Sequence, residues 1–185
     1  MDNFGLILSG VMAVGATLFL VSTITLTLVW RRNPERFPRV AQLIATEGGA
    51  LFFMISAIAV VASLIFSEII GWEPCLLCWY QRIFYYPLPL LAGLALYRKT
   101  FAESVPYLSV LAWGGMLIAL WHSALQQIPG LREVMSGVSA CSVRGPSCFD
   151  RYVELLGFVT IPLMSLMVFV GLILLLGLIR RQAQR

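Results

Sequence analysis

Two cysteines set three residues apart are the residues of this chain best suited to chemistry. Cys75 and Cys78 stand in the segment Pro74-Cys-Leu-Leu-Cys-Trp-Tyr-Gln-Arg82, directly before a long apolar stretch. Thiols at this spacing can close a disulfide across one helical turn, and a helix N-terminus stabilises the reactive thiolate. Arg82 follows Cys78 by four residues, so both lie on one face of a helix. The pattern indicates a redox-active dithiol.

The positive charge of Arg82 would stabilise a Cys78 thiolate, and the size of this effect can be calculated. At about 6 Å and an effective dielectric constant near 20, its attraction for a Cys78 thiolate is about 3 kcal/mol, or about two pKa units. Two simpler interpretations stay open. A Cys-x-x-Cys pair is also half of many zinc sites, and an arginine near a helix end can extend its charge to the membrane surface.

The composition indicates an integral membrane protein. Of 185 residues, 59% are hydrophobic and 12% are charged, and the mean hydropathy is +0.88. Uncharged apolar stretches of about 20 residues span a bilayer as helices. The sequence therefore predicts an all-α fold with five membrane-spanning helices, at residues 4–30, 48–67, 83–97, 107–125 and 155–179.

Basic residues at the helix ends predict the orientation. Arg31, Arg32, Arg36 and Arg39 follow the first apolar stretch, and further clusters stand at residues 98–99 and 180–185. Since positive loops stay in the cytoplasm, the N-terminus and both cysteine segments are expected outside. The net charge of +4 then reflects topology rather than a nucleic-acid partner. The first stretch is expected to remain attached, because its charges follow the apolar run instead of preceding it as in a signal peptide.

All four cysteines fall on this expected outer side, where disulfides persist. Cys141 and Cys148 lie between the fourth and fifth apolar stretches, separated by a Gly-Pro turn signal. Four cysteines allow three connectivities, and spacing favours Cys75 with Cys78 and Cys141 with Cys148. A purely structural disulfide is the alternative for the second pair. Apolar residues at helical spacing over 128–138 predict a short helix on the membrane surface.

An oxidised dithiol must pass two electrons on, and the chain carries no nucleotide-binding motif and no iron–sulfur spacing. This points to an acceptor dissolved in the membrane, such as a quinone. His122 and Gln126 share one helix face near the expected depth of Arg82, and all three side chains can donate hydrogen bonds to quinone oxygens. A transporter or a channel is disfavoured, because no stretch carries an ionisable residue near its middle.

The segment Cys75-Leu-Leu-Cys78-Trp-Tyr-Gln-Arg82, a second outer cysteine pair and the run Gly157-Phe-Val-Thr-Ile-Pro162 closely resemble the disulfide bond formation protein B family. The resemblance covers about residues 47–179. It implies a quinone-dependent thiol oxidase of the bacterial inner membrane that reoxidises a thioredoxin-like extracytoplasmic dithiol oxidase. By position, Cys75 and Cys78 would be the quinone-coupled pair and Arg82 the quinone-polarising residue. Cys141 and Cys148 would face the partner, and His122 and Gln126 match a His-x-x-x-Gln found in some members.

The prediction is thus a four-helix thiol oxidase domain at residues 47–185, preceded by an extra membrane helix and a cytoplasmic connector at residues 1–46. The quinone would be a ubiquinone or a menaquinone, and the product would support disulfide bond formation. Because every residue assigned to chemistry follows Glu47, we expect the first helix to be dispensable for thiol oxidation. The alternatives are a zinc-binding membrane scaffold and a vitamin K epoxide reductase-like quinone reductase.

Overall fold

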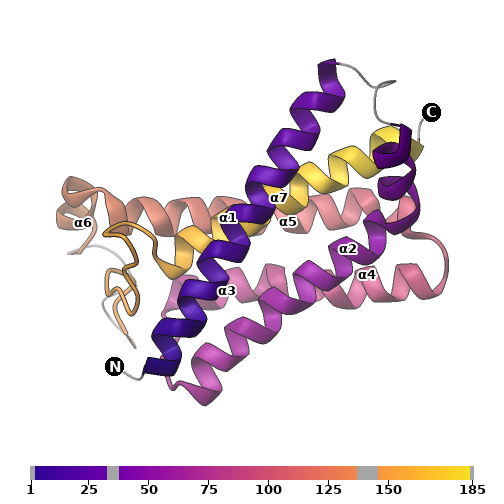
Figure 1. The fold of residues 1–185 in the computed structure, drawn as a ribbon. Coiled ribbons are helices and arrows are strands. Elements are labelled where there is room, and N and C mark those ends of the chain that lie inside the picture. Colours follow the sequence, from indigo (N-terminus) through magenta and orange to yellow (C-terminus); the bar gives the residue numbers. More distant parts are fainter. Residues whose placement is uncertain (1–2, 33–37, 137–145, 184–185) are drawn as a thin grey trace.

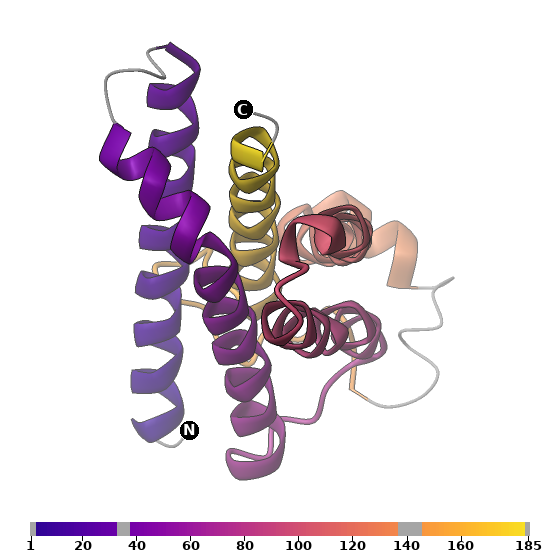
Figure 2. The ribbon, with the colours of Figure 1, turned by 90° about the vertical axis from the view of Figure 1, so that its right-hand side faces the viewer.

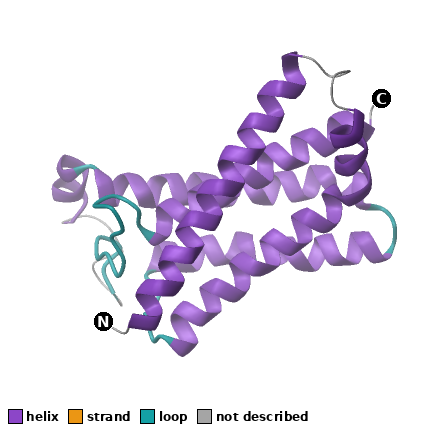
Figure 3. Ribbon diagram, viewed as in Figure 1, coloured by secondary structure: helices purple, strands orange, loops and turns teal. Residues whose placement is uncertain are grey.

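The computed structural model describes residues 3–32, 38–136 and 146–183, and these residues form helices joined by short loops (Figure 3). No β-strand occurs among them, apart from one isolated bridge between Leu155 and Val159. In chain order the helices are α1 (Asn3–Arg32), α2 (Pro38–Leu64), a π-helical turn (Ile65–Ile69) that continues α2, α3 (Leu76–Tyr85), α4 (Pro87–Tyr97), α5 (Phe101–Gln127), α6 (Pro129–Ser136) and α7 (Ile161–Ala183).

Four helices are long and apolar enough to cross a membrane: α1, α2 with its π-helical turn, α5 and α7. Only 17% to 44% of the residues in their most apolar segments are buried, so most of this apolar surface faces outward, as a bilayer requires. The third predicted span, residues 83–97, corresponds to α4 and the end of α3, which follow one another with a break before Pro87. Taken as one rod, residues 76–97 extend about 33 Å, enough to span. The predicted all-α bundle with an additional N-terminal helix is confirmed.

Several helix boundaries differ from the sequence-based expectation; α5, for example, begins at Phe101 rather than at residue 107. The last helix begins at Ile161 rather than at residue 155, because Leu156 and Gly157 adopt φ values of 55° and 77° in a tight turn closed by the Leu155–Val159 bridge. α2 begins at Pro38, so the expected division between residues 46 and 47 falls inside a helix. The predicted short helix after residue 128 is present as α6, and its expected last residue, Val138, lies outside the described residues.

α7 is the central helix, with α5, α2 and α1 packed around it (Figure 2). Phe169 is fully buried where α7 meets α5, and a Cβ atom on Gly115 would collide with its ring. In a bilayer, close approach through small residues supplies the packing energy that the hydrophobic effect supplies in water. α1 also packs closely at a glycine, because the Phe19 ring lies against Gly171 of α7 at the edge of the bundle.

The two ends of the bundle differ in composition. The N-terminus of α1, the start of α3, α6 and residues 146–160 lie at one end, and the C-terminus and the turn between α4 and α5 lie at the other (Figure 1). That turn carries Arg98 and Lys99, and the last turn of α7 carries Arg180 and Arg181. Both cysteine-bearing loops that the structure describes therefore lie opposite the basic residues, which is the arrangement that the charge pattern predicts.

Candidate active site

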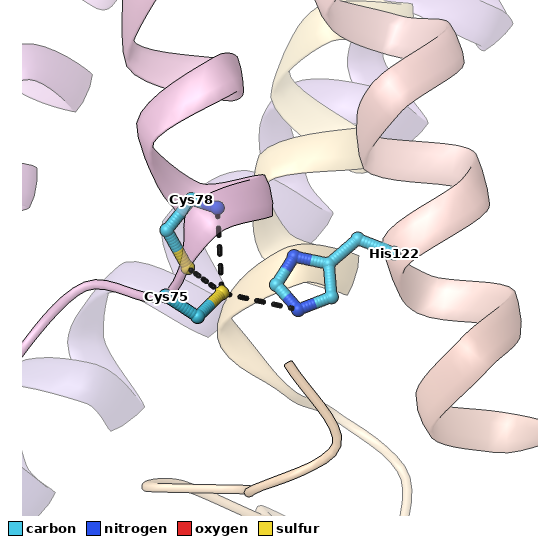
Figure 4. Close-up of side chains that lie close together, drawn as sticks. All are labelled: Cys75, Cys78 and His122. Atoms are coloured by element: carbon cyan, nitrogen blue, oxygen red, sulfur yellow. Dashed lines mark hydrogen bonds between the residues drawn. The ribbon is translucent and has the colours of Figure 1, made fainter. Parts of the chain in front are cut away.

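Cys75 caps the N-terminus of α3, and Cys78 lies one turn further into the helix (Figure 4). The extended backbone at Cys75 (φ −68°, ψ 170°) turns its Sγ back toward the helix, where it accepts a hydrogen bond from the Cys78 backbone N–H at 3.4 Å. The two Sγ atoms share a hydrogen bond at 3.1 Å, and both cysteines are free. The pair is therefore in its reduced state, within easy reach of disulfide closure.

His122 of α5 points its ring at Cys75 (Figure 4). Its Nε2 lies 3.7 Å from Cys75 Sγ and 3.1 Å from the carbonyl oxygen of Cys148. On the other side of the ring, the Gln81 amide donates to Nδ1 at 3.0 Å, which leaves the hydrogen on Nε2. The ring is only 1% exposed. His122 is thus held in one tautomer, with an N–H directed at the space between Cys75 and Cys148.

Cys148 lies fully buried beside Cys75. It is disulfide-bonded, and it shares one apolar cluster with Cys75 and Phe149. The Gln126 amide donates to the carbonyl oxygens of Cys148 and Asp150, both at 3.2 Å, which ties this segment to the end of α5. Cys141, the predicted partner of Cys148, lies outside the described residues. Three predicted site residues on separate segments, Cys75, His122 and Cys148, are therefore brought together.

The environment lowers the pKa of Cys75 well below that of an ordinary thiol. The largest cause is the hydrogen bond with the Cys78 side chain; burial opposes the shift, and the neighbouring His122 lowers the pKa further. The position at a helix N-terminus acts in the same direction. In the reduced pair the negative charge thus rests on Cys75, whereas the sequence analysis assigned the thiolate to Cys78 because of Arg82.

A cavity of about 130 Å³, which we call the large cavity, lies among α1, α2, α3 and α7. Cys78 and Arg82 line it from α3, and Ser63, Ser165 and Ala16 line it from the other three helices. Most of its lining is apolar; the hydroxyl oxygen of the lining residue Ser165 is buried without a hydrogen-bond partner among the described residues. The lining of the large cavity is thus mostly apolar, and it also includes Cys78, Arg82 and Ser165.

Arg82 is held firmly at the edge of this cavity. It is 8% exposed, its guanidinium donates to the Ser63 carbonyl oxygen at 2.9 Å, and it lies 5.1 Å from the centre of the Trp79 ring. These two contacts hold the guanidinium in place, and its remaining N–H groups can donate further hydrogen bonds. Trp72 lines the cavity and stacks between Phe66 and Tyr152.

A second, small cavity of about 30 Å³ lies on the other side of the cysteine pair. Cys75, His122 and Gln126 line it together with Ser147, residues 150–153 and residues 160–162, while Cys78 lines both cavities. His122 and Gln126 were expected to share a quinone site with Arg82, but they do not line the large cavity. The structure brings them together with Cys75 instead.

Sequence reasoning missed several residues of these cavities. Gln81 fixes the His122 tautomer, and Trp72, Tyr152 and Ser165 line the large cavity. Trp72, Tyr152 and Ser165 belong to no pattern with the cysteines, because each comes from a different segment of the chain. Only Gln81, next to Arg82 in the motif, carried a signal.

The sulfur atoms of Cys75 and Cys78 and one ring nitrogen of His122 lie within 4.8 Å of one another, which is close enough to hold a metal ion. Two thiolates on a tetrahedral zinc ion, each about 2.3 Å from the metal, are about 3.8 Å apart. The observed separation of 3.1 Å between the sulfur atoms is shorter and suits a dithiol that closes to a disulfide. A fourth ligand is absent from the group in the part of the chain that the structure describes.

Residues 47–179 match the family model described as "Disulfide bond formation protein DsbB". The chain belongs to this family. It is 38% identical over 138 residues to the probable disulfide formation protein C 2 of Bacillus anthracis, a match that covers 74% of this chain and 94% of that relative. It is 37% identical over 128 residues to disulfide bond formation protein C of Bacillus subtilis (strain 168), with 69% and 88% covered. No solved structure matches the chain. The protein is thus a multi-pass membrane protein of a disulfide-forming, thiol-oxidising family.

The low pKa of Cys75 can be tested by alkylation, with the loop disulfide kept intact. In a Cys78→Ser variant, which retains a hydroxyl donor, Cys75 should react with iodoacetamide at lower pH than in Cys78→Ala. Adding His122→Phe to Cys78→Ser should move the midpoint upward, toward the ordinary thiol value of about 8.5. Gln127→Ala is the matched control, because Gln127 also anchors the outer segment, through Phe158, without approaching Cys75. Identical midpoints near 8.5 in all variants would contradict the assignment.

Proposed function

We propose that this protein is a membrane thiol:quinone oxidoreductase that draws electrons from a thioredoxin-like extracytoplasmic dithiol oxidase. The observation that carries the proposal is that the two cysteines of the pair have different surroundings. Cys75 lies against His122 and Cys148, whereas Cys78 lines the large cavity with Arg82. One sulfur therefore contacts the loop that faces a protein partner, and the other contacts an apolar chamber in the membrane region.

On the loop side, burial decides which sulfur a partner can attack. Cys148 is 0% exposed, so a partner thiolate cannot reach it in line with its disulfide bond. We therefore assign the attacked sulfur to Cys141, with Cys148 as the leaving thiolate. A second partner thiolate then releases Cys141, and the partner leaves oxidised, with the loop pair reduced.

The reduced loop pair next reduces the disulfide between Cys75 and Cys78. The Cys148 thiolate attacks Cys75, the bond between Cys75 and Cys78 breaks, and Cys78 leaves as a thiolate. Attack of Cys141 on Cys148 restores the loop disulfide and frees Cys75. The N–H of His122, directed at the space between Cys75 and Cys148, stabilises the thiolates that appear there.

The residues that line the large cavity are chemically suited to bind a quinone. The apolar walls suit the ring and its tail, and Arg82 and the unpaired Ser165 hydroxyl can donate hydrogen bonds to ring oxygens. A bound quinone supplies a two-electron acceptor, so that dithiol and quinone become disulfide and hydroquinone with two protons transferred. Cys78 would present its sulfur to the ring, and Arg82 would stabilise negative charge there. Whether the quinone is a ubiquinone or a menaquinone depends on the host membrane.

We further propose that the protein resides in the bacterial cell membrane with its cysteine loops on the extracytoplasmic side. The positions of the basic residues at the opposite end of the bundle support this orientation. It also places the loop disulfide in the compartment where disulfides persist.

The function is tested by mixing the purified protein anaerobically with a reduced thioredoxin-like dithiol protein and a benzoquinone carrying a decyl tail. The quinone absorbance should fall, with one hydroquinone formed for each partner disulfide, and the Cys78→Ala variant should be inactive. Metal analysis of the same preparation tests the zinc-binding alternative. Stoichiometric zinc together with an unchanged quinone absorbance would contradict the proposal in favour of the scaffold.

Substitutions of Arg82 test the quinone side separately. Arg82→Leu should raise the KM for the decyl benzoquinone by about tenfold or more, because a charge-assisted hydrogen bond is lost. Arg82→Lys should recover part of this loss, since lysine keeps the charge without the planar fork. The rate at which a reduced partner exchanges with the loop disulfide should stay within about twofold in both variants. An unchanged KM in Arg82→Leu would mean that Arg82 only extends to the membrane surface.

A further inference from the structure

The additional helix α1 lines the same cavity as Cys78 and Arg82. Met12 and Ala16 of α1 contribute to the wall of the large cavity, and Ala16 is 6% exposed. α1 lies outside the family match at residues 47–179. This wall is therefore a feature of this chain beyond what the family match describes.

α1 is fixed in place by packing on α7 and at the outer end of the bundle. It crosses α7 at an angle (Figure 1), and Phe19 fits against Gly171 where the two helices meet. Near its N-terminus, Gly5 lies against the Trp72 ring, which would be 3.1 Å from a Cβ atom added there. Ala13 joins Val153 and Met164 in a buried cluster. By contrast, α1 has few direct contacts with α2 and α3, so the large cavity occupies the space among these helices.

The lining of the large cavity changes along the bundle. Its outer part is lined by Cys78, Arg82 and the ring of Trp72. The lining residues furthest from the outer end on their helices are Ala16 of α1, Ala59 of α2 and Val168 of α7, together with Tyr85, whose hydroxyl donates to the Ser165 carbonyl oxygen. A polar reacting end and an apolar inner end match a ring that carries a hydrocarbon tail.

We propose that α1 completes the quinone site, with Met12 and Ala16 forming the wall against which the first part of the quinone's hydrocarbon tail lies. The assignment rests on the proposed function and deepens it. Ala16 stands where the tail leaves the ring region, so its small side chain keeps the inner end of the cavity open. The expectation that the first helix is dispensable for thiol oxidation stays a prediction; the proposal gives α1 a role in the affinity for tailed quinones.

The test compares the binding of two probes to the purified full chain: a benzoquinone with a decyl tail and the same ring without a tail. Ala16→Leu should raise the Kd of the decyl probe by about tenfold and leave that of the tail-less ring within about twofold. Ser22→Leu is the matched control, because it also enlarges a small α1 residue but does so on the exposed face. Equal decyl-probe affinities in Ala16→Leu and Ser22→Leu would overturn the proposal.

A second measurement uses only the unaltered protein, so it does not depend on how a variant folds. A decyl benzoquinone with a photoreactive group in its tail should label Met12 and Ala16, and excess unlabelled decyl benzoquinone should suppress that labelling. Labelling of Val14 and Leu18, which face outward and are 60% and 63% exposed, should persist, because it comes from the surrounding lipid or detergent. Suppressible labelling confined to α2, α3 and α7 would overturn the role of α1. Absence of quinone reduction by the unaltered protein would instead overturn the proposed function.

Discussion

The structure of the site depends on the hydrogen bond with which Cys75 caps α3. The cap holds Cys75 Sγ outside the helix and places Cys78 one turn inside, 3.1 Å away. A pair at this spacing can close and open without moving the helix, because only the side chains need to turn. It also separates the two sulfurs by direction: one toward His122 and the loop, the other toward the large cavity. The proposed path for electrons follows from this single local geometry.

The surrounding polar groups are buried at the end of a membrane bundle, where an unpaired donor or acceptor is costly. The segment around Cys148 meets this constraint through side chains from α3 and α5. Gln81 orients His122, His122 and Gln126 donate to the carbonyl oxygen of Cys148, and Tyr152 donates to that of Glu73. The same bonds that satisfy the backbone hold the loop cysteine beside the helix pair. Structural stability and redox geometry are therefore supplied by one network.

The sequence predicted the fold well, because a bilayer imposes simple rules of length and polarity. The apolar stretches identified the spanning helices, and the family motif located Cys75, Cys78 and Arg82. Spacing alone placed His122 and Gln126 at the depth of Arg82, but it could not tell which side of α5 they face. They lie with Cys75 because the outer segment folds over them and its carbonyl oxygens need donors. The position of α1 could likewise not be predicted from the sequence, because it depends on side-chain packing such as that of Phe19 against Gly171.

The central claim is that Cys75 faces the loop and Cys78 faces the quinone. The most direct test is the visible absorption of two single variants after addition of a decyl benzoquinone. In Cys75→Ala, the Cys78 thiolate has lost its disulfide partner and still lines the large cavity, so a new long-wavelength charge-transfer band should appear. Cys78→Ala should show no such band, because Cys75 lies on the other side of the pair. A band in Cys78→Ala and none in Cys75→Ala would contradict the account.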